Sequence, residues 1–402
     1  MLRALQATLR EGDLVAVHLT PGQLWVRVLR ALWRCGAAAL PLDARLTPGE
    51  IAEIRRRAMP TVVIDVTGVH REASGRSVEP TTALVIGTSG STGSPRLVEL
   101  GREAVSAAVR ASATALGAGS DDPWLCCLPP AHVGGALVLY RGLLLDAPVS
   151  VRRRLAPGHG MGAAPWRFTS VVPTQLRRAL DEGLELRGFS ALLVGGASLD
   201  EALGADAAAA GARVVPTYGL TESCGGVVYA GRPLPGVEVA VLRQNAPQRS
   251  GAGEVLLRGP MLMHGYLSDE CEGDSPFIGG GWLRTHDAGE IDEAGLLRVH
   301  GRIADAINTG GETVWPAEVE AALATHPRVA DVAVAAEPDA EWGERVVAYV
   351  VPVRRAAPPT LLDLREHSSL TLARYKAPRE VRIVDVIPRG ALGKRRRDQS
   401  TE

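Results

Sequence analysis

Short apolar runs alternate along the chain with longer stretches rich in alanine, leucine and arginine, up to about residue 300. A short apolar run is typical of a buried strand, whereas apolar residues at every third or fourth position are typical of a helix. The pattern predicts strands over residues 62–65, 84–88, 124–128, 169–172, 191–194 and 214–217. It predicts helices over residues 101–116, 174–182 and 199–210. This alternation indicates α/β layering.

The pattern changes beyond residue 237, where strands alternate apolar and polar positions, as in residues 253–258. Such alternation is typical of antiparallel strands with one exposed face. A compact unit follows, with helices predicted over residues 316–325 and 361–373 and strands over 329–335, 345–351 and 379–386. We therefore expect an α/β protein with a large N-terminal domain of layered α/β subdomains, residues 1–301, and a small mobile α+β C-terminal domain, residues 302–402.

Composition and charge are those of an ordinary globular protein. Hydrophobic residues make up 46% and charged residues 22% of the 402 positions, and the formal net charge is −1. Nothing in this balance attracts nucleic acid or an anionic membrane over a distance. No apolar run reaches the roughly 18 residues that span a bilayer, so we expect no membrane span. From the balanced charge we expect small-molecule partners and no nucleic acid. A homodimer is the candidate assembly.

The predicted compartment is the cytoplasm. Residues 1–13 carry charges where a secretory signal would be apolar. The five cysteines lack the paired spacing of a metal site and suit a reducing environment.

Lysine is almost absent from the chain. Of the 44 basic residues, only Lys376 and Lys394 are lysines, and the other 42 are arginines. A compact ammonium and a planar guanidinium are not interchangeable where geometry matters. The two lysines are therefore candidates for positions that require an ammonium, although a solvated surface position also fits Lys376.

A loop rich in glycine and hydroxyl groups follows the predicted strand 84–88. It runs from Ser89 to Arg96 with the sequence SGSTGSPR. Glycines allow backbone N–H groups to turn inward, and several hydroxyls with one cation suit phosphate binding. The loop lacks the Gly-Lys-Ser/Thr ending of a P-loop, so this stretch alone also fits a structural turn.

Three further clusters combine groups that can bind a nucleotide. Tyr218-Gly219-Leu220-Thr221-Glu222 follows the predicted strand 214–217, and its ring, hydroxyl and carboxylate can stack a base, contact a phosphate and bind a hard cation. Alone, Glu222 also fits a carboxylate at a helix start. The third cluster covers residues 281–287 and continues at Gly301-Arg302, and the fourth covers residues 388–394.

In this order and at these separations, the four clusters resemble the adenylate-forming superfamily of acyl-CoA synthetases, luciferases and peptide-synthetase adenylation domains. The resemblance covers residues 13–397 and includes the element GAAALPLD at Gly36–Asp43. The chain is shorter at its N-terminus than most of the family. What the resemblance implies is the use of ATP, Mg²⁺ and coenzyme A.

The resemblance also implies a nucleotide site. The loop around the β- and γ-phosphates would comprise Thr88, Ser89, Gly90, Ser91, Thr92, Gly93 and Arg96, with Arg96 in place of the usual lysine. The adenine would be framed by Gly195, Gly196, Ala197 and Tyr218.

Other positions would bind the rest of Mg·ATP. Thr221 would lie near the α-phosphate, and Glu222 would be the Mg²⁺ ligand. Asp287 would accept hydrogen bonds from the ribose hydroxyls, and Arg302 would support the ribose and phosphates. His286 stands where the family usually has glycine, and we expect it to narrow the nucleotide pocket.

The acyl pocket is implied by LPPAHVGG at residues 128–135, where His132, Val133 and Gly134 would line the path to the substrate carboxylate. His132 alone also fits a buried core histidine. Lys394 would be the mobile lysine of the C-terminal domain, and Gly310 with Gly311 would line the pantetheine channel.

Within the family, residues 217–239, which include Gly225 as a substrate contact, most resemble the o-succinylbenzoate–CoA ligases of menaquinone biosynthesis. Such a diacid keeps one carboxylate that is not activated, and burying it uncompensated costs several kcal/mol. Arg141, nine residues after His132, is the candidate cation, although a surface arginine fits the sequence equally well.

We therefore expect an acid–thiol ligase in which His132, Thr221, Glu222 and Lys394 are catalytic. Carboxylate and ATP would give an acyl-adenylate, and the CoA thiol would then attack it. Two alternatives stay open: an aryl or acyl ligase of secondary metabolism that uses CoA or a carrier-protein thiol, and a non-catalytic nucleotide-binding paralogue. The presence of both Glu222 and Lys394 argues against the paralogue.

Overall fold

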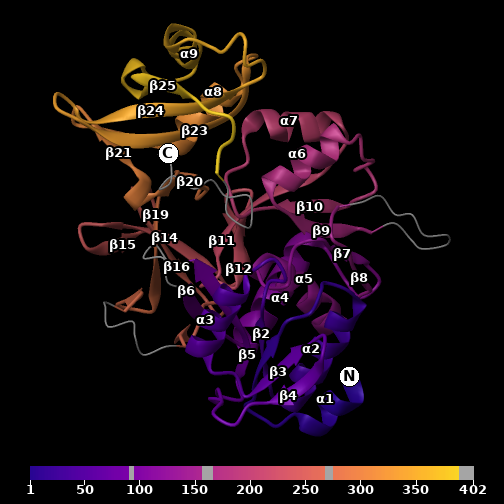
Figure 1. Cartoon of the computed structure of the whole chain (residues 1–402). Coiled ribbons are helices and arrows are strands. Elements are labelled where there is room, and N and C mark those ends of the chain that lie inside the picture. The colour runs from indigo at the N-terminus through magenta and orange to yellow at the C-terminus, as the bar shows by residue number, and fades with distance from the viewer. Residues whose placement is uncertain (90–94, 156–165, 268–274, 389–402) are drawn as a thin grey trace. The chain divides into compact units, whose positions relative to one another are not determined.

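The computed structural model describes residues 1–89, 95–155, 166–267 and 275–388 (Figure 1). By its internal contacts the chain divides into two compact units. The first contains Met1–Gly196, Asp206–Glu238 and Leu257–Leu283. The second contains Ala197–Ala205, Val239–Leu256 and Arg284–Glu402. The division predicted from the sequence, at residue 302, stays a prediction.

A seven-stranded sheet forms one layer of the first unit. Its strands are β1 (Leu14–Val17), β2 (Ala38–Pro41), β3 (Val62–Asp65), β4 (Gly68–Arg71), β5 (Thr82–Ser89), β6 (Pro95–Gly101) and β17 (Gly265–Tyr266). Their order is β17-β6-β5-β2-β1-β3-β4, with β5, β2, β1 and β3 parallel. Every residue of β1 and β2 is buried, as expected for parallel strands covered on both faces.

A second seven-stranded sheet forms another layer of this unit. Its strands are β7 (Trp124–Cys126), β8 (Val149–Val151), β9 (Phe168–Val171), β10 (Ala191–Val194), β11 (Val214–Leu220), β12 (Gly225–Tyr229) and β13 (Arg232–Pro233). Their order is β13-β12-β11-β10-β9-β7-β8, and the five strands from β11 to β8 are parallel. The strands predicted at 124–128, 169–172, 191–194 and 214–217 all lie here.

Helices lie between the two sheets. The helices of this unit are α1 (Leu2–Thr8), α2 (Gln23–Cys35), α3 (Pro48–Ala58), α4 (Arg102–Leu116), α5 (Val133–Leu144) and α6 (Pro173–Asp181). α2 contacts β2 and β8, whereas α4 contacts β5, β6 and β12, so each touches both sheets. α5 packs against α2 and α4 and is buried throughout its middle, because its sequence is apolar all round. This layering confirms the predicted α/β class.

A third sheet is largely antiparallel. It contains β14 (Glu238–Arg243), β15 (Ala246–Gln248), β16 (Gly251–Arg258), β18 (Phe277–Ile278), β19 (Trp282–Ile291) and β20 (Leu297–Arg302). The order is β15-β14-β16-β19-β18, and β20 pairs with β19. The short helix α7 (Glu201–Ala209) precedes these strands in the chain and begins where Asp200 accepts a hydrogen bond from the Leu203 N–H.

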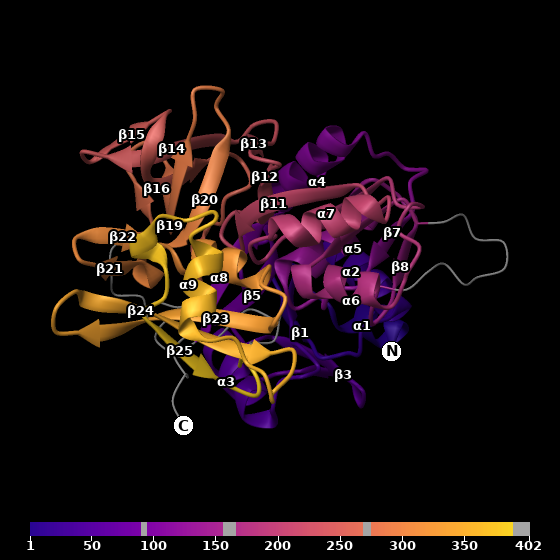
Figure 2. The same ribbon diagram turned by 90° about the horizontal axis from the view of Figure 1, so that it is seen from above.

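The C-terminal part forms a five-stranded sheet with two helices on one face (Figure 2). Its elements are β21 (Ile307–Thr309), β22 (Glu312–Val314), α8 (Pro316–Ala324), β23 (Val329–Asp339), β24 (Gly343–Pro352), α9 (Leu361–Ser368) and β25 (Glu380–Ile383). Short 3₁₀ turns occur at Ile303–Asp305 and Arg374–Lys376. Apolar residues of the helices and strands share one core, which includes Val319, Leu323, Val334, Val346 and Leu364.

The second helix of this part is shorter than predicted. The pattern favours a helix over residues 361–373, but α9 ends at Ser368. The hydroxyl of Ser368 donates to the Arg365 carbonyl, and that of Ser369 donates to the Glu366 carbonyl. Such hydroxyls compete for backbone carbonyls and weaken the last turn of a helix.

Candidate active site

The candidate phosphate loop begins and ends on a β-hairpin of the first unit. Thr88 on β5 lies opposite Arg96 on β6, and its hydroxyl donates to the Arg96 carbonyl at 3.3 Å. The Arg96 guanidinium lies 5.5 Å from the centre of the Tyr266 ring. Gly90, Ser91, Thr92 and Gly93 lie outside the described residues, as does the side chain of Ser89.

The carboxyl end of β11 carries the adenine and metal candidates. Tyr218 and Thr221 are half-buried there, at the end of a parallel strand where ligands of α/β sheets bind. Gly195, at the end of the neighbouring β10, packs so closely that a β-carbon would lie 2.3 Å from the Thr217 hydroxyl. The Thr217 side chain therefore leaves no room for a β-carbon at position 195. Gly196 has φ +80° and is exposed, as is Ala197.

Glu222 is oriented by Tyr266, which lies far from it in the sequence. The Tyr266 hydroxyl donates to Glu222 Oε1 at 3.1 Å, and the Glu222 carbonyl accepts from the Met263 N–H. Burial and the nearby Glu222 carboxylate raise the pKa of Tyr266 to about 12, so this hydroxyl stays a donor at neutral pH. Among the described residues no group of three or more acidic, histidine or cysteine side chains could hold a metal. One carboxylate still fits Mg²⁺, which is commonly bound by one or two carboxylates together with substrate phosphates.

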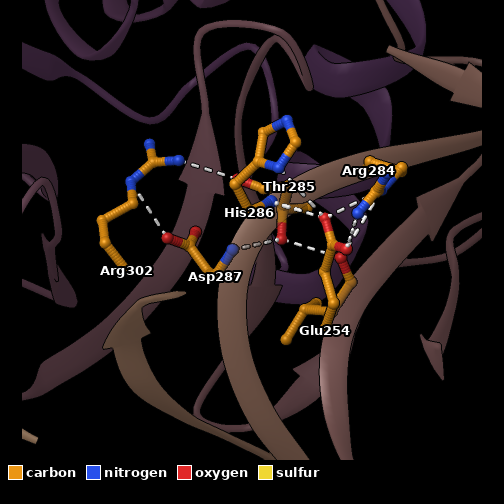
Figure 3. A network of polar contacts seen from close by, with 7 residues as sticks. Glu254, Arg284, Thr285, His286, Asp287 and Arg302 are labelled. Carbon is orange, nitrogen blue, oxygen red and sulfur yellow. Dashed lines mark hydrogen bonds and ion pairs between the residues drawn. The ribbon is translucent and has the colours of Figure 1, made fainter. Parts of the chain in front are cut away.

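The ribose candidates lie in the second unit, on β19 and β20 (Figure 3). Asp287 is buried, and its Oδ1 lies 3.1 Å from Arg302 Nε. Arg302 also donates to the Thr285 carbonyl at 2.7 Å, and Asp287 N–H donates to the Thr285 hydroxyl at 3.1 Å. The three residues form one hydrogen-bonded group that fixes the Asp287 backbone.

Glu254 supports this group from the neighbouring strand. Its buried carboxylate accepts from Arg284 at 2.6 Å and from the His286 N–H at 3.0 Å. His286 has φ +57°, a left-handed conformation that explains why glycine suits this position. The imidazole is largely exposed, with Nδ1 3.4 Å from Glu254, and in Figure 3 it points away from the Asp287 carboxylate. Nothing in this placement supports the expected narrowing of the nucleotide pocket.

The acyl-pocket candidates gather at α5 in the first unit. His132 immediately precedes the helix, and Val133, Leu137 and Arg141 follow one another along a single face. That face packs against Gly225, where a β-carbon would lie 2.8 Å from Leu137 Cδ1. At Gly134 a β-carbon would lie 3.2 Å from Leu128 Cδ1, which leaves little room for a larger residue.

Among the described residues, Arg141 is a buried cation without an anionic partner. It is 4% exposed, lies 4.7 Å from the centre of the Trp124 ring and donates to the Ser112 hydroxyl at 3.0 Å. Its Nε has no hydrogen-bond partner, and within the described ranges no carboxylate lies at ion-pair distance. The surface position that the sequence left open for Arg141 is therefore wrong.

The remaining candidates lie in the second unit. Gly310 and Gly311 form the turn between β21 and β22, with φ +60° and +85°, so the hairpin itself requires glycines there. A β-carbon at Gly310 would also lie 2.6 Å from the Trp342 ring. Lys376 forms an ion pair of 2.7 Å with Glu318. Lys394 lies outside the described residues.

Sequence reasoning missed three supporting residues: Asp43 beside His132, Tyr266 beside Glu222, and Glu254 beside His286. Each lies on a different element from the residue it supports. The only available signal concerned Asp43, which closes the GAAALPLD element.

Comparison with known proteins identifies the family of this chain. Residues 70–267 match the family model for the AMP-binding enzyme, and residues 318–394 match that for its C-terminal domain. A "Probable 2-succinylbenzoate–CoA ligase" of Mycobacterium tuberculosis (strain ATCC 25618 / H37Rv) is 38% identical, over 84% of this chain and 88% of the relative. The 2-succinylbenzoate–CoA ligase of Bacillus subtilis (strain 168) is 29% identical, over 98% and 88%.

Solved structures resemble the whole chain. The o-succinylbenzoate CoA synthetase (MenE) from Bacillus subtilis in complex with the acyl-adenylate intermediate OSB-AMP has a TM-score of 0.87 at 26% identity, covering 100% of this chain and 90% of that one. The same enzyme with ATP and magnesium ion has a TM-score of 0.85, covering 99% and 91%.

These matches confirm a larger N-terminal and a smaller C-terminal domain in an adenylate-forming fold. No helix in the described ranges is long and apolar enough to cross a membrane. The expectation drawn from the four sequence clusters is confirmed: the chain belongs to the AMP-binding enzyme family.

Proposed function

We propose that this protein is an ATP-dependent o-succinylbenzoate–CoA ligase that works through an acyl-adenylate. In the first step a substrate carboxylate oxygen attacks the α-phosphorus of ATP, and pyrophosphate leaves. In the second step the CoA thiol attacks the acyl carbon, and AMP leaves with the electron pair of the broken bond. The relatives named for this activity support the proposal.

The observation that carries the substrate is Arg141. A guanidinium that is 4% exposed and has no carboxylate partner among the described residues is costly to bury. A substrate whose second carboxylate reached Arg141 would neutralise this charge and accept from Nε, which has no partner. A monoacid would leave the charge uncompensated, so Arg141 favours a diacid over a simple aromatic acid.

Different residues bind the adenine, the ribose and the phosphates of ATP. Tyr218 stacks on the adenine beside the close-packed Gly195 and the exposed Gly196, and Asp287 accepts hydrogen bonds from the ribose while Arg302 holds its carboxylate. Thr88, Arg96 and Thr221 donate to phosphate oxygens. When bound, Mg²⁺ neutralises phosphate charge, and Glu222, oriented by Tyr266, is the residue that would hold it.

Two further assignments complete the mechanism. Lys394 donates to the oxygens on which charge concentrates in the first step, where a compact ammonium fits between the attacking and bridging atoms. Gly310 and Gly311 line the pantetheine channel in the second step. Domains of residues 1–301 and 302–402, a cytoplasmic location and a homodimer belong to the same proposal, and size-exclusion chromatography with light scattering tests the dimer.

A pyrophosphate-exchange screen tests the function. The purified chain with Mg·ATP is offered o-succinylbenzoate, benzoate and an aliphatic acid in turn, followed by CoA or a carrier protein. We expect exchange with o-succinylbenzoate and thioester formation with CoA. Exchange with benzoate at the same efficiency would contradict the diacid, and ATP binding without exchange for any acid would favour the non-catalytic paralogue.

A further inference from the structure

The imidazole of His132 lies against two charged side chains from another part of the fold. Its Nε2 is 3.4 Å from Asp43 Oδ2 and 3.4 Å from Arg45 Nη2. Asp43 follows strand β2 of the first sheet, whereas His132 follows strand β7 of the second sheet and precedes α5. The three side chains therefore lie where β2 of the first sheet and β7 of the second sheet end, both within the first unit.

Asp43 is buried and held by a bidentate ion pair. It is 7% exposed, and it accepts from Arg45 Nε at 2.9 Å, from Arg45 Nη2 at 2.5 Å and from the Arg45 N–H at 3.0 Å. Burial alone raises the pKa of this carboxyl, but hydrogen bonds from Arg45 and His132 outweigh burial and hold the pKa well below its ordinary value. Asp43 is therefore a fixed anion at neutral pH.

The ring of His132 is fixed by these polar contacts at one edge. Its carbonyl accepts from the N–H groups of Gly135 and Ala136, so the backbone is anchored by the first turn of α5. Nε2 donates to Asp43 or accepts from Arg45, according to the tautomer, and either contact anchors this edge of the ring. The His132 side chain is 24% exposed, so the buried core histidine that the sequence left open does not describe this arrangement.

We propose that Asp43 is a positioning residue that holds the His132 imidazole in the orientation needed at the acyl pocket, an inference that rests on the proposed function. A carboxylate hydrogen-bonded to one ring nitrogen fixes the tautomer and direction of an imidazole. Arg45 fixes the carboxylate in turn. Removing the Asp43 charge leaves His132 in place but lets its ring rotate, so the substrate carboxylate meets a less well placed group.

A double-mutant cycle tests this coupling. Asp43→Asn, His132→Ala and the double variant are assayed for adenylation of o-succinylbenzoate, with kcat and KM for acid and for ATP measured separately. We expect Asp43→Asn to lower kcat/KM for the acid by about 10-fold in the wild-type background, which lies within the usual range for residues in contact, and by less than about 2-fold in the His132→Ala background. The KM for ATP should stay unchanged.

The surface pair of Asp65 and His70 supplies a matched control. Its Oδ1 to Nε2 distance is 3.7 Å, and both residues lie on the β3–β4 hairpin, outside the proposed acyl pocket. Asp65→Asn removes the same charge from a comparable pair and should leave adenylation unchanged. Arg45→Met is the second variant in case Asp43→Asn folds poorly, because it retains the buried carboxylate but removes its clamp.

A spectroscopic measurement separates this inference from the proposed function. The ¹⁵N resonances of the His132 ring, assigned by comparison with His132→Ala, report its tautomer in the free protein. We expect Asp43→Asn to shift them and Asp65→Asn to leave them in place. A wild-type chain that fails to adenylate o-succinylbenzoate overturns the proposed function, yet the resonances still decide whether Asp43 holds the ring. Unshifted resonances, or losses of activity that multiply in the double variant, would overturn the positioning role.

Discussion

Arg141 on α5 and Arg302 on β20 differ in their exposure and in their partners. The Arg302 side chain is 40% exposed; it pairs with Asp287 and donates to the Thr285 carbonyl. Arg141 as a whole residue is 4% exposed, and its described contacts are one hydroxyl and one aromatic ring. Among the described residues, the more exposed arginine therefore has the anionic partner that the buried one lacks.

The difference separates two uses of a cation. A guanidinium paired with a carboxylate of its own chain organises that carboxylate for a ligand, as Arg302 does for Asp287. A buried guanidinium without such a partner is complementary to an anion that arrives with the ligand, because binding then relieves the cost of burial. Substitutions at these and related residues test this distinction.

The largest expected effect concerns a third cation, Lys394. We propose that it stabilises the transition state of adenylation rather than the bound substrates or products. Lys394→Ala should lower the adenylation rate by roughly 10² to 10³, equivalent to about 3 to 4 kcal/mol. Transfer from preformed acyl-adenylate to CoA should persist. Single-turnover measurements of the two half-reactions check this.

Lys394→Arg should be nearly as damaging, because the bulkier guanidinium does not fit between the reacting oxygens. The matched control is Lys376→Arg, which retains a cation beside Glu318 and should leave both half-reactions intact. Near wild-type adenylation by Lys394→Arg would show that the surviving lysine is an accident of composition.

Arg141→Met is expected to have the next largest effect. It removes the charge while keeping most of the stem volume, so the KM for o-succinylbenzoate should rise by about 100-fold, within the usual cost of truncating one partner of a buried charge pair. The KM for ATP should be unchanged, and activity toward benzoate should not fall. Initial-rate kinetics with Arg110→Met, an exposed arginine on α4, as the control measure this. An equal loss toward both acids would indicate a purely structural role.

Arg302→Met should have a smaller effect, and this effect should fall on the KM for ATP rather than on the KM for the acid. Asp287 keeps the hydrogen bond from its own N–H to the Thr285 hydroxyl, but its carboxylate loses its cation, so we expect the KM for ATP to rise by about 10-fold. The KM for the acid should stay the same. Equilibrium binding of ATP, followed by calorimetry, checks the ground-state origin of the effect. If only the KM for the acid changed, Arg302 and Arg141 would not differ in the ligand that each one serves.

The smallest expected effect is that of His286→Gly. Glycine relieves the left-handed backbone at φ +57° but loses the contact with Glu254, so the free energy of unfolding should change by no more than about 1 kcal/mol. Thermal unfolding measures this change. Because the imidazole is directed away from Asp287, the KM for ATP should not move, and a clear fall in this KM would restore the idea that His286 narrows the pocket.

Local sequence patterns predicted the layers of the fold but not all of its pairings. Val62–Asp65 and Ala191–Val194 coincide with β3 and β10, because a short apolar run bounded by polar residues determines a buried strand locally. The pairing of β17 with β6, by contrast, brings Tyr266 beside Val98. No local period encodes such a contact, so neither the pairing nor the Tyr266–Glu222 hydrogen bond was predictable.

The same limit applies to the candidate site. Clusters such as Tyr218 to Glu222 are contiguous, and their chemistry can be recognised in the sequence. Asp43 and Glu254 act across elements, and the burial of Arg141 depends on how α5 packs between two sheets. Sequence reasoning therefore named residues that would touch the ligands but missed those that hold them in place.

The ion pair between Lys376 and Glu318 also matters for the modification of the protein's own lysines by an acyl-adenylate. A mixed anhydride of this kind acylates neutral amines, including lysines of the protein that makes it. This chain offers two ε-amino groups in 402 residues, and one of them is paired with the Glu318 carboxylate at 2.7 Å. An arginine-rich surface in place of a lysine-rich one therefore leaves the protein with few nucleophiles that its own intermediate can modify.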